Sequence, residues 1–333
     1  MKLRHLFPGL PPRAIAALLG ATLAVTASAA PPAPVYPTKP VRWVIPFPPG
    51  GGNDLLGRAF AERLGERLGQ PLVPDNRGGA STIIAAEIVA RAPADGYTLL
   101  MGTNTTLAVM PSLRSKLPYD PIKDFDPVSL LSSSPYLLVV HPGVPAKTVT
   151  ELIALSKSRP GQLNYASPGF GTSNQLACEL FKTMSGADLT HVPYKGTAAA
   201  ITDLLGGRVA VMFSSTAAVR PMVNAGKLRA LGISTAKRSP AMPEIAPIAE
   251  SGVPGFDTAS WVGLIVPRGT PRPVITRLNS EIATVIKQGE LRDRLAAQGF
   301  VPEASTPEEF AAHIKSELAR FRKLVQVAGL PVE

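Results

Sequence analysis

Three consecutive glycines, Gly50, Gly51 and Gly52, join an apolar strand pattern to a helical pattern. Glycine accepts positive φ and exposes backbone amides, and amides at a helix start carry the positive end of the helix dipole. Such a turn can bind an anion. Asn53 and Asp54 follow where a triphosphate loop needs Lys and Ser or Thr, which argues against nucleoside triphosphates. The alternative is a connecting loop without a ligand, in which Asn53 or Asp54 caps the helix.

A second glycine turn, residues 167–173, precedes another helical pattern. Gly169 and Gly171 lack the third glycine that the dinucleotide fingerprint requires, so we do not expect a dinucleotide. Thr172 with Gln175 forms a capping box. The turn is therefore either an anion site or a capped helix start without a ligand.

If both turns bind a ligand, substitutions at Gly51 and Gly171 should impair binding. A β-branched residue would block the approach of a ligand, and at positive φ it would cost about 1–3 kcal/mol. We therefore expect Gly51→Val or Gly171→Val to abolish binding while leaving the fold largely intact.

Short apolar runs that predict strands alternate with helical patterns along the chain. This alternation predicts an α/β fold with mostly parallel sheets flanked by helices, whose ligands lie at the carboxyl ends of the strands. The predicted strands are 41–45, 72–74, 97–101, 163–166, 192–194, 209–213 and 228–233.

Two similar segments, 136–145 and 261–271, each consist of an apolar strand that ends in prolines and glycine. We interpret them as matched crossings between two lobes. The first lobe is predicted to be discontinuous, and the helix after Thr306 is expected to pack back on it. The predicted bounds are 36–137 and 256–333 for the first lobe and 138–255 for the second.

The first 29 residues have the pattern of a secretory signal: three basic residues, an apolar run and then Ala27-Ser28-Ala29. The run is shorter than the ~20 residues of a membrane-spanning helix, which favours cleavage, predicted after Ala29, over a retained anchor. We therefore expect a periplasmic protein. Cys178 is the single cysteine, so no intramolecular disulfide is expected.

The 333 residues suffice for about two domains, and a composition that is 45% hydrophobic and 17% charged predicts a globular chain. The formal charge is +10, but the basic residues are scattered, so no nucleic-acid partner is expected. The sequence contains no nucleophile elbow, zinc-protease motif or paired cysteines, and we expect no catalytic residues, metal or cofactor. A hydrolase acting on a small carboxylate ester remains the alternative function.

A series of ordered motifs matches one known family: segments 46–54, 76–80, 95–100, 117–121, 165–172, 192–196, 203–207 and 226–231. Through them the chain resembles the Bug-type periplasmic receptors associated with tripartite tricarboxylate transporters, over essentially residues 36–330. The resemblance implies a type II periplasmic-binding fold, in which two lobes close on a small carboxylate held largely by backbone groups and water.

One departure from the family bears on the ligand: similar receptors often carry an acid shortly after the strand that ends in Phe213, where this chain has Ser214 and Ser215. A neutral pocket with Lys195 as its nearby cation disfavours an ammonium group. We therefore expect a dicarboxylate or an aromatic acid. Expected partners are integral-membrane transporter subunits or a sensor kinase, and the receptor is expected to be monomeric.

The predicted ligand-binding residues come from the strand ends and glycine turns of both lobes. They are Phe47, Pro49, Gly50, Gly51, Gly52, Asn53, Asp54, Ala80, Ser81, Gly102, Thr103, Asn104, Ser167, Gly169, Gly171, Thr172, Ser173, Tyr194, Lys195, Gly196, Ser214 and Ser215.

Overall fold

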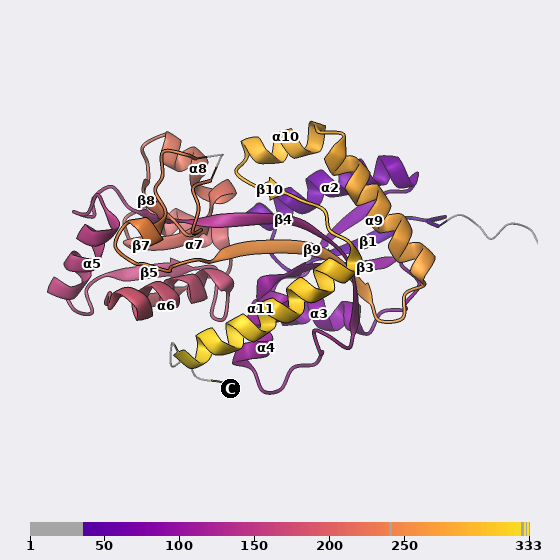
Figure 1. Cartoon of the computed structure of the whole chain (residues 1–333), viewed down its shortest axis with the longest axis horizontal. Helices are drawn as coiled ribbons and strands as arrows, with labels where there is room; N and C mark the ends of the chain where they lie inside the picture. The colour runs from indigo at the N-terminus through magenta and orange to yellow at the C-terminus, as the bar shows by residue number, and fades with distance from the viewer. Residues whose placement is uncertain (1–35, 240–241, 328–329, 331, 333) are drawn as a thin grey trace, which may run out of the picture. The chain divides into compact units, whose positions relative to one another are not determined.

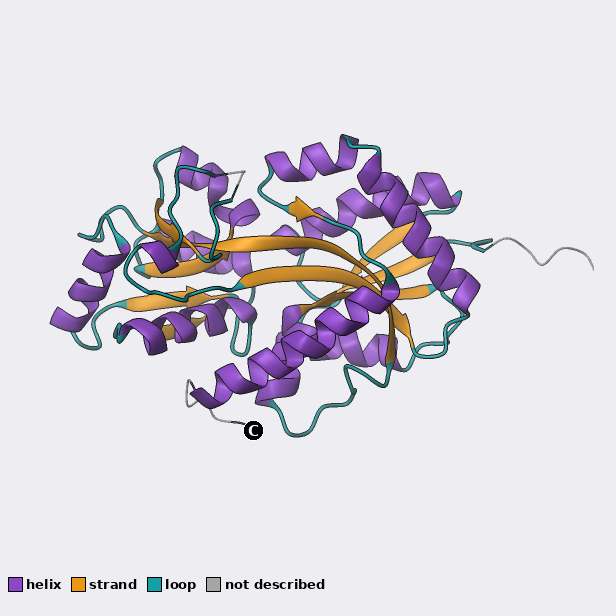
Figure 2. Ribbon diagram, viewed as in Figure 1, coloured by secondary structure: helices purple, strands orange, loops and turns teal. Residues whose placement is uncertain are grey.

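The structure, a computed structural model, describes residues 36–239 and 242–327 together with residues 330 and 332. The predicted signal peptide and its cleavage after Ala29 lie outside the described residues. Figure 1 follows the chain from β1 to α11, and Figure 2 shows strands enclosed by helices.

The first sheet contains the parallel strands predicted from the first strand–helix units. β1 (Val41–Ile45) lies between β2 (Leu72–Asn76) and β3 (Thr98–Thr103) and is parallel to both. The edge of β3 is extended by the antiparallel strand β9 (Ala259–Pro267). The sheet is therefore mixed, with its parallel part formed by strands that are followed by helices.

The strand β4 (Phe125–Val140) connects the two lobes. It pairs antiparallel with β9 as far as Pro135, and from Tyr136 onward it pairs with β7 (Val211–Ser215) and β8 (Arg229–Ile233). Figure 2 shows β4 as a long strand common to both halves of the structure. The fold therefore has two lobes, while the exact lobe bounds 36–137, 256–333 and 138–255 remain a prediction.

The second sheet repeats the parallel pattern. β5 (Asn164–Ser167) lies between β6 (Thr190–Pro193) and β7 and is parallel to both. A further short strand, β10 (Val301–Pro302), pairs with the first part of β4. The helices of this lobe are α5 (Val149–Ser158), α6 (Ser173–Ser185), α7 (Thr197–Leu205), α8 (Thr216–Asn224) and the 3₁₀ turn η4 (Ile248–Glu250).

Helices cover both faces of the first sheet, which explains the apolar runs 43–45 in β1 and 99–101 in β3. Trp43 packs with Phe60 beneath one layer of helices, and the next residue, Val44, packs with Phe310 beneath the other. Figure 1 shows α2, α9 and α10 on one side and α3, α4 and α11 on the other. The bounds are α2 (Gly52–Leu68), η2 (Ala80–Thr82), α3 (Ile83–Ala90), the π-helix η3 (Thr105–Val109), α4 (Met110–Leu113), α9 (Arg272–Lys287), α10 (Glu290–Ala297) and α11 (Pro307–Val327).

The second lobe is built in the same way, because neighbouring residues of β4 enter different cores. Leu138 packs with Phe181 of α6, whereas Val139 packs with Leu204 of α7. The last helix, α11, packs against β4, η3 and α4, as its apolar stripe predicts. Both sheets are thus fixed by apolar burial on two faces.

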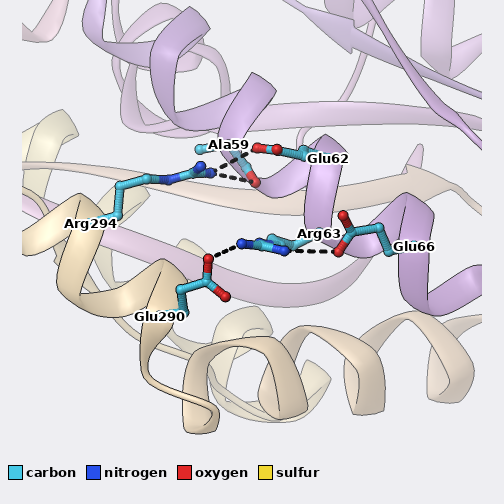
Figure 3. A network of polar contacts seen from close by, with 6 residues as sticks. All are labelled: Ala59, Glu62, Arg63, Glu66, Glu290 and Arg294. Atoms are coloured by element: carbon cyan, nitrogen blue, oxygen red, sulfur yellow. Dashed lines mark hydrogen bonds and ion pairs between the residues drawn. The ribbon is translucent and has the colours of Figure 1, made fainter.

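An ion-pair network joins α2 to α10 on the surface (Figure 3). Arg63 bonds both Glu66 and Glu290, and Arg294 bonds Glu62 at 3.0 Å. Exposed pairs of this kind contribute only ~0.2–1 kcal/mol each. The position of α2, which carries the first glycine turn, therefore depends mainly on its apolar face.

Candidate ligand-binding site

A small polar cavity lies where residues of both lobes meet. It encloses about 40 Å³, and no charged side chain lines it. Its lining residues are Phe47, Gly52, Asn53, Thr103, Asn104, Thr105, Tyr136, Pro168, Ser173, Asn174, Thr197, Ser215 and Ser260.

The starts of four helices converge on this cavity. Gly52, Ser173 and Thr197 are the first residues of α2, α6 and α7, and Ser215 is the N-cap of α8. The unpaired amides of a first turn and the helix dipole both favour negative charge. A cavity without cationic side chains can therefore still bind an anion.

Ser173 lies at the centre of a buried hydrogen-bond network. The Tyr136 hydroxyl donates to Ser173 Oγ at 2.7 Å, and the Thr105 hydroxyl donates to the same oxygen at 3.3 Å. Thr105 in turn accepts from the Ser173 amide at 3.2 Å. Because Ser173 Oγ accepts both bonds, its own hydrogen is available to a ligand in the cavity.

Tyr136 is a hydrogen-bond donor and not an anion. Burial raises the pKa of its hydroxyl above the usual value, although hydrogen bonds involving Ser173, Asn104 and Ser260 act in the opposite direction. Within the described residues, the side chains of Asn53, Thr197 and Ser215 have no hydrogen-bond partner. These polar groups, together with the Ser173 hydroxyl, can bind a carboxylate.

The first glycine turn differs from the sequence prediction in its cap and its backbone. Gly51 is the N-cap of α2, so the prediction of Asn53 or Asp54 as cap is wrong. The expected positive φ is found at Gly50 (84°) and not at Gly51 (−85°). A Cβ on Gly51 would meet no atom within 4 Å, so the structure removes the reason for a conformational cost there.

Asp54 stabilises this turn from the interior. Its carboxylate accepts hydrogen bonds from the Gly50 amide at 2.9 Å, from Asn76 Nδ2 at 3.0 Å and from Arg58 Nε at 3.0 Å. Burial would raise the pKa of this carboxyl, but the bonds from Arg58, Gly50 and Asn76 hold the pKa below its usual value. Asp54 lies outside the cavity lining because its oxygens face these donors.

The second glycine turn has the predicted capping box. Thr172 Oγ1 accepts from the Gln175 amide at 3.4 Å, and Gln175 Oε1 accepts from the Gly171 amide at 2.6 Å. Gly171 has the expected positive φ of 70°, and a Cβ there would lie 2.8 Å from the sulfur of Met110. The cap and the glycine together place Ser173 and Asn174 on the cavity wall.

A wider groove of about 640 Å³ adjoins the cavity. Lys195 is the only charged residue in its lining, and the Tyr194 hydroxyl is turned to Asp203, to which it donates at 2.8 Å. The groove is lined by Pro46, Phe47, Pro48, Pro49, Asn76, Gly78, Gly79, Ala80, Ser81, Thr82, Pro168, Gly169, Thr172, Tyr194, Lys195 and Gly196.

The structure brings most of the predicted site residues to these two spaces, and the remainder lie outside both linings. Ser167, for example, bonds His191 at 2.7 Å, and the Ser214 hydroxyl is buried without a partner among the described residues. The predicted residues outside both linings are Gly50, Gly51, Asp54, Gly102, Ser167, Gly171 and Ser214.

Six residues of the cavity lining were not predicted from the sequence. Asn174 and Thr197 follow predicted turns directly, so extending each turn into the first helical residues would have found them. Tyr136 and Ser260 lie on the connecting strands β4 and β9, for which no sequence signal indicated a role at the site. The six are Thr105, Tyr136, Pro168, Asn174, Thr197 and Ser260.

No histidine, cysteine or carboxylate lines the cavity. The three histidines of the described residues lie elsewhere: His191 stacks on Tyr165, His313 packs edge-on against Trp261, and His141 accepts from the Gly143 amide. No cluster of three or more metal-ligating side chains occurs among the described residues. Nor is any described helix both long and apolar enough to cross a membrane.

Comparison with known families gives a match over residues 56–330 to the tripartite tricarboxylate transporter family receptors. The chain belongs to this family. Its curated relatives include BugT of Bordetella pertussis, which is 37% identical over 94% of this chain and 97% of its own length. A protein from the tcbD-tcbE intergenic region of Pseudomonas sp. strain P51 is 39% identical over 92% of both chains.

Solved structures of similar proteins share the fold of this receptor. The R. palustris protein Rpa4515, solved with adipate, has a TM-score of 0.86 and 40% identity, covering 88% of this chain and 98% of its own. MatC of Rhodopseudomonas palustris, solved with bound malate, has a TM-score of 0.82 and 34% identity, covering 87% of this chain and 100% of its own. The periplasmic binding protein BugD is 31% identical with a TM-score of 0.84, covering 89% of this chain and 99% of its own.

Family and fold together confirm the interpretation as a periplasmic solute-binding receptor with a type II periplasmic-binding fold. The relatives are receptors and not enzymes, so the hydrolase alternative has no support.

Proposed function

We propose that this receptor captures a small organic carboxylate, a dicarboxylate or an aromatic acid, between its lobes and delivers it to a membrane transporter or sensor. The observation that carries the proposal is the convergence of four helix starts on a cavity without charged side chains. Relatives solved with adipate and malate support the same ligand class.

The chemistry of the cavity disfavours a cationic ligand. No carboxylate lines it, and β7 ends in Ser214 and Ser215. An ammonium group buried without an anionic partner would cost several kcal/mol. A ligand carboxylate, in contrast, can accept hydrogen bonds from Ser173, from Thr197 and from first-turn amides.

A thermal-shift screen of the mature protein tests this proposal. The panel contains dicarboxylates, aromatic monocarboxylates, amino acids, sugars and polyamines. A ligand at about a hundred times its Kd adds roughly 2.7 kcal/mol to the stability of the folded state, which raises Tm measurably. We expect only the dicarboxylates or the aromatic monocarboxylates to raise Tm. Stabilisation only by sugars or polyamines would refute the proposal.

Maturation and partners complete the proposed function. We infer cleavage of the exported chain after Ala29, because Ala27-Ser28-Ala29 offers small residues at the cut. The intact mass of the exported protein checks this, and a mass that retains residues 1–29 would contradict it. The mature receptor is proposed to act as a monomer on transporter subunits or a sensor kinase, without a nucleic-acid partner, cofactor or metal.

A further inference from the structure

Three loops line both the small cavity and the adjoining groove. Two of the loops pass from the groove to the cavity between consecutive residues, from Thr172 to Ser173 and from Gly196 to Thr197. The third, residues 46–53, lines the groove up to Pro49 and the cavity from Gly52. Phe47 and Pro168 line both spaces. A molecule held by one carboxylate in the cavity therefore has a direct path into the groove.

The two spaces differ greatly in size. A volume of ~10–15 Å³ on this scale holds one water, so the cavity of about 40 Å³ holds about three water-sized groups. One carboxylate consists of three heavy atoms and fills it. The rest of the ligand must therefore lie in the groove, whose 640 Å³ falls in the range of small-molecule sites.

The groove offers an apolar wall and one cation. Four of its residues, 46–49, are prolines and a phenylalanine, and Lys195 is exposed. Within the described residues, Lys195 has no ion-pair partner. The nearby Asp203 is already occupied, because it accepts hydrogen bonds from Tyr194 and forms an ion pair with Arg208.

We propose that the groove is a second subsite, which binds the apolar body of a long dicarboxylic acid and places its far carboxylate at the ammonium group of Lys195. The near carboxylate occupies the cavity. The inference rests on the proposed function, since it requires a carboxylate at the helix starts. It makes Lys195, which lies outside the cavity, the residue that determines the preferred length and distal charge of the ligand.

The first test is a length series measured by isothermal titration calorimetry on the mature protein. The acids are succinate, adipate, suberate and sebacate, each compared with the monocarboxylate of equal chain length. Affinity is expected to rise about two- to fourfold for each added methylene that the groove buries. The dicarboxylates are expected to exceed their matched monocarboxylates only once they are long enough to reach Lys195.

The second test replaces the positive charge of Lys195 by a neutral side chain of similar length. Lys195→Met should weaken binding of the best long dicarboxylate about two- to fivefold and leave succinate and the matched monocarboxylate unchanged. Lys195→Glu should reverse the preference, so that an ω-amino acid of the same length binds more tightly than the dicarboxylate. Lys227→Met, in an exposed turn that lines neither space, is the control and should bind as the wild type does.

The outcomes separate this inference from the function on which it rests. If succinate binds but added length brings no gain, or if Lys195→Met weakens all acids equally, the second subsite is refuted while the carboxylate receptor stands. If no acid of any length binds, both are refuted.

Discussion

The hydroxyl of Tyr136 donates a hydrogen bond of 2.7 Å to Ser173, and both side chains are buried at the wall of the cavity. Tyr136 lies where β4 changes partners from the first sheet to the second, and Ser173 is the first residue of α6. The bond therefore links the strand that connects the lobes to one of the helix starts that face the ligand.

Tyr136→Phe is expected to lower both stability and affinity. The loss of one buried hydrogen bond should reduce the free energy of unfolding by about 0.5–1.5 kcal/mol, and the loss of the donor that positions Ser173 should weaken acid binding about tenfold. Urea unfolding and calorimetry measure the two effects. Tyr36→Phe is the control, because the Tyr36 hydroxyl bonds Gly96 O at 2.6 Å away from the cavity. That control should lose stability without losing affinity. Equal affinity losses in both variants would contradict the role of Tyr136 in positioning Ser173.

The two glycine turns should respond differently to alanine. Gly171 has a φ of 70° and a crowded Cβ position, so Gly171→Ala should cost about 1–2 kcal/mol of stability and weaken binding. Gly51 has a φ of −85° and open space, so Gly51→Ala should change stability by less than about 0.5 kcal/mol. Urea unfolding of both variants measures this difference. A larger loss of stability in the Gly51 variant than in the Gly171 variant would contradict the prediction.

The local sequence pattern was sufficient to predict those elements that are marked by one strong signal. The strand at Val41–Ile45 and the capping box of Thr172 were predictable because apolar runs and caps are local features. The first part of β4 was not predicted, because Pro127, Pro135 and the serines between them disfavour a strand. Its strand conformation depends on pairing with β9, which lies more than a hundred residues further along the chain.

Asp54→Asn should destabilise the protein in a pH-dependent way. At neutral pH, the loss of charged hydrogen bonds to Arg58 and Gly50 should cost about 1.5–3 kcal/mol. The folded-state pKa of Asp54 lies below its usual value of 3.8, so the contribution is complete above that value and is lost as pH falls through the folded-state pKa. The difference between wild type and variant should therefore shrink in acid.

Urea unfolding between neutral and strongly acidic pH measures this difference. Asp293→Asn is the control, since Asp293 is exposed at 71% and its replacement should change stability by less than about 0.5 kcal/mol. A gap between wild type and Asp54→Asn that stays constant through the acid range would show that the charge of Asp54 does not act as described.

Ligand-dependent closure should depend on a contact across the groove. The Ser81 hydroxyl donates to the Phe170 carbonyl, and Ala80, Ser81 and Thr82 all have positive φ, which is costly for residues other than glycine. Ser81→Ala should therefore favour an open form and weaken acid binding several-fold. Ser158→Ala, which removes a hydroxyl bonded within α5, is the matched control.

Small-angle scattering with and without a saturating acid measures closure. The radius of gyration is expected to fall when the acid binds, and the ligand-free Ser81→Ala protein should be the most open of the set. A radius that does not change with ligand in any variant would count against lobe closure.

The lining of the cavity was predictable only where it coincides with strand ends and helix starts. Gly52, Asn53 and Ser173 were found because glycine turns and caps mark these positions. Tyr136 and Ser260 were missed because they reach the cavity from β4 and β9, through long-range strand pairing. The sequence also does not show where a side chain points. For this reason it did not predict that the Asp54 carboxylate accepts hydrogen bonds within its own turn.

In the function we propose, neutral groups and helix starts bind the negative charge of a carboxylate. The most direct measurement compares the dissociation constants of adipate and adipamide by calorimetry on the mature receptor, because the two differ in charge but hardly in shape. Bonds to a charged acceptor are about twice as strong as neutral ones, so adipate should bind roughly a hundredfold more tightly. Equal affinity for the acid and its amide would show that the cavity does not recognise the carboxylate charge.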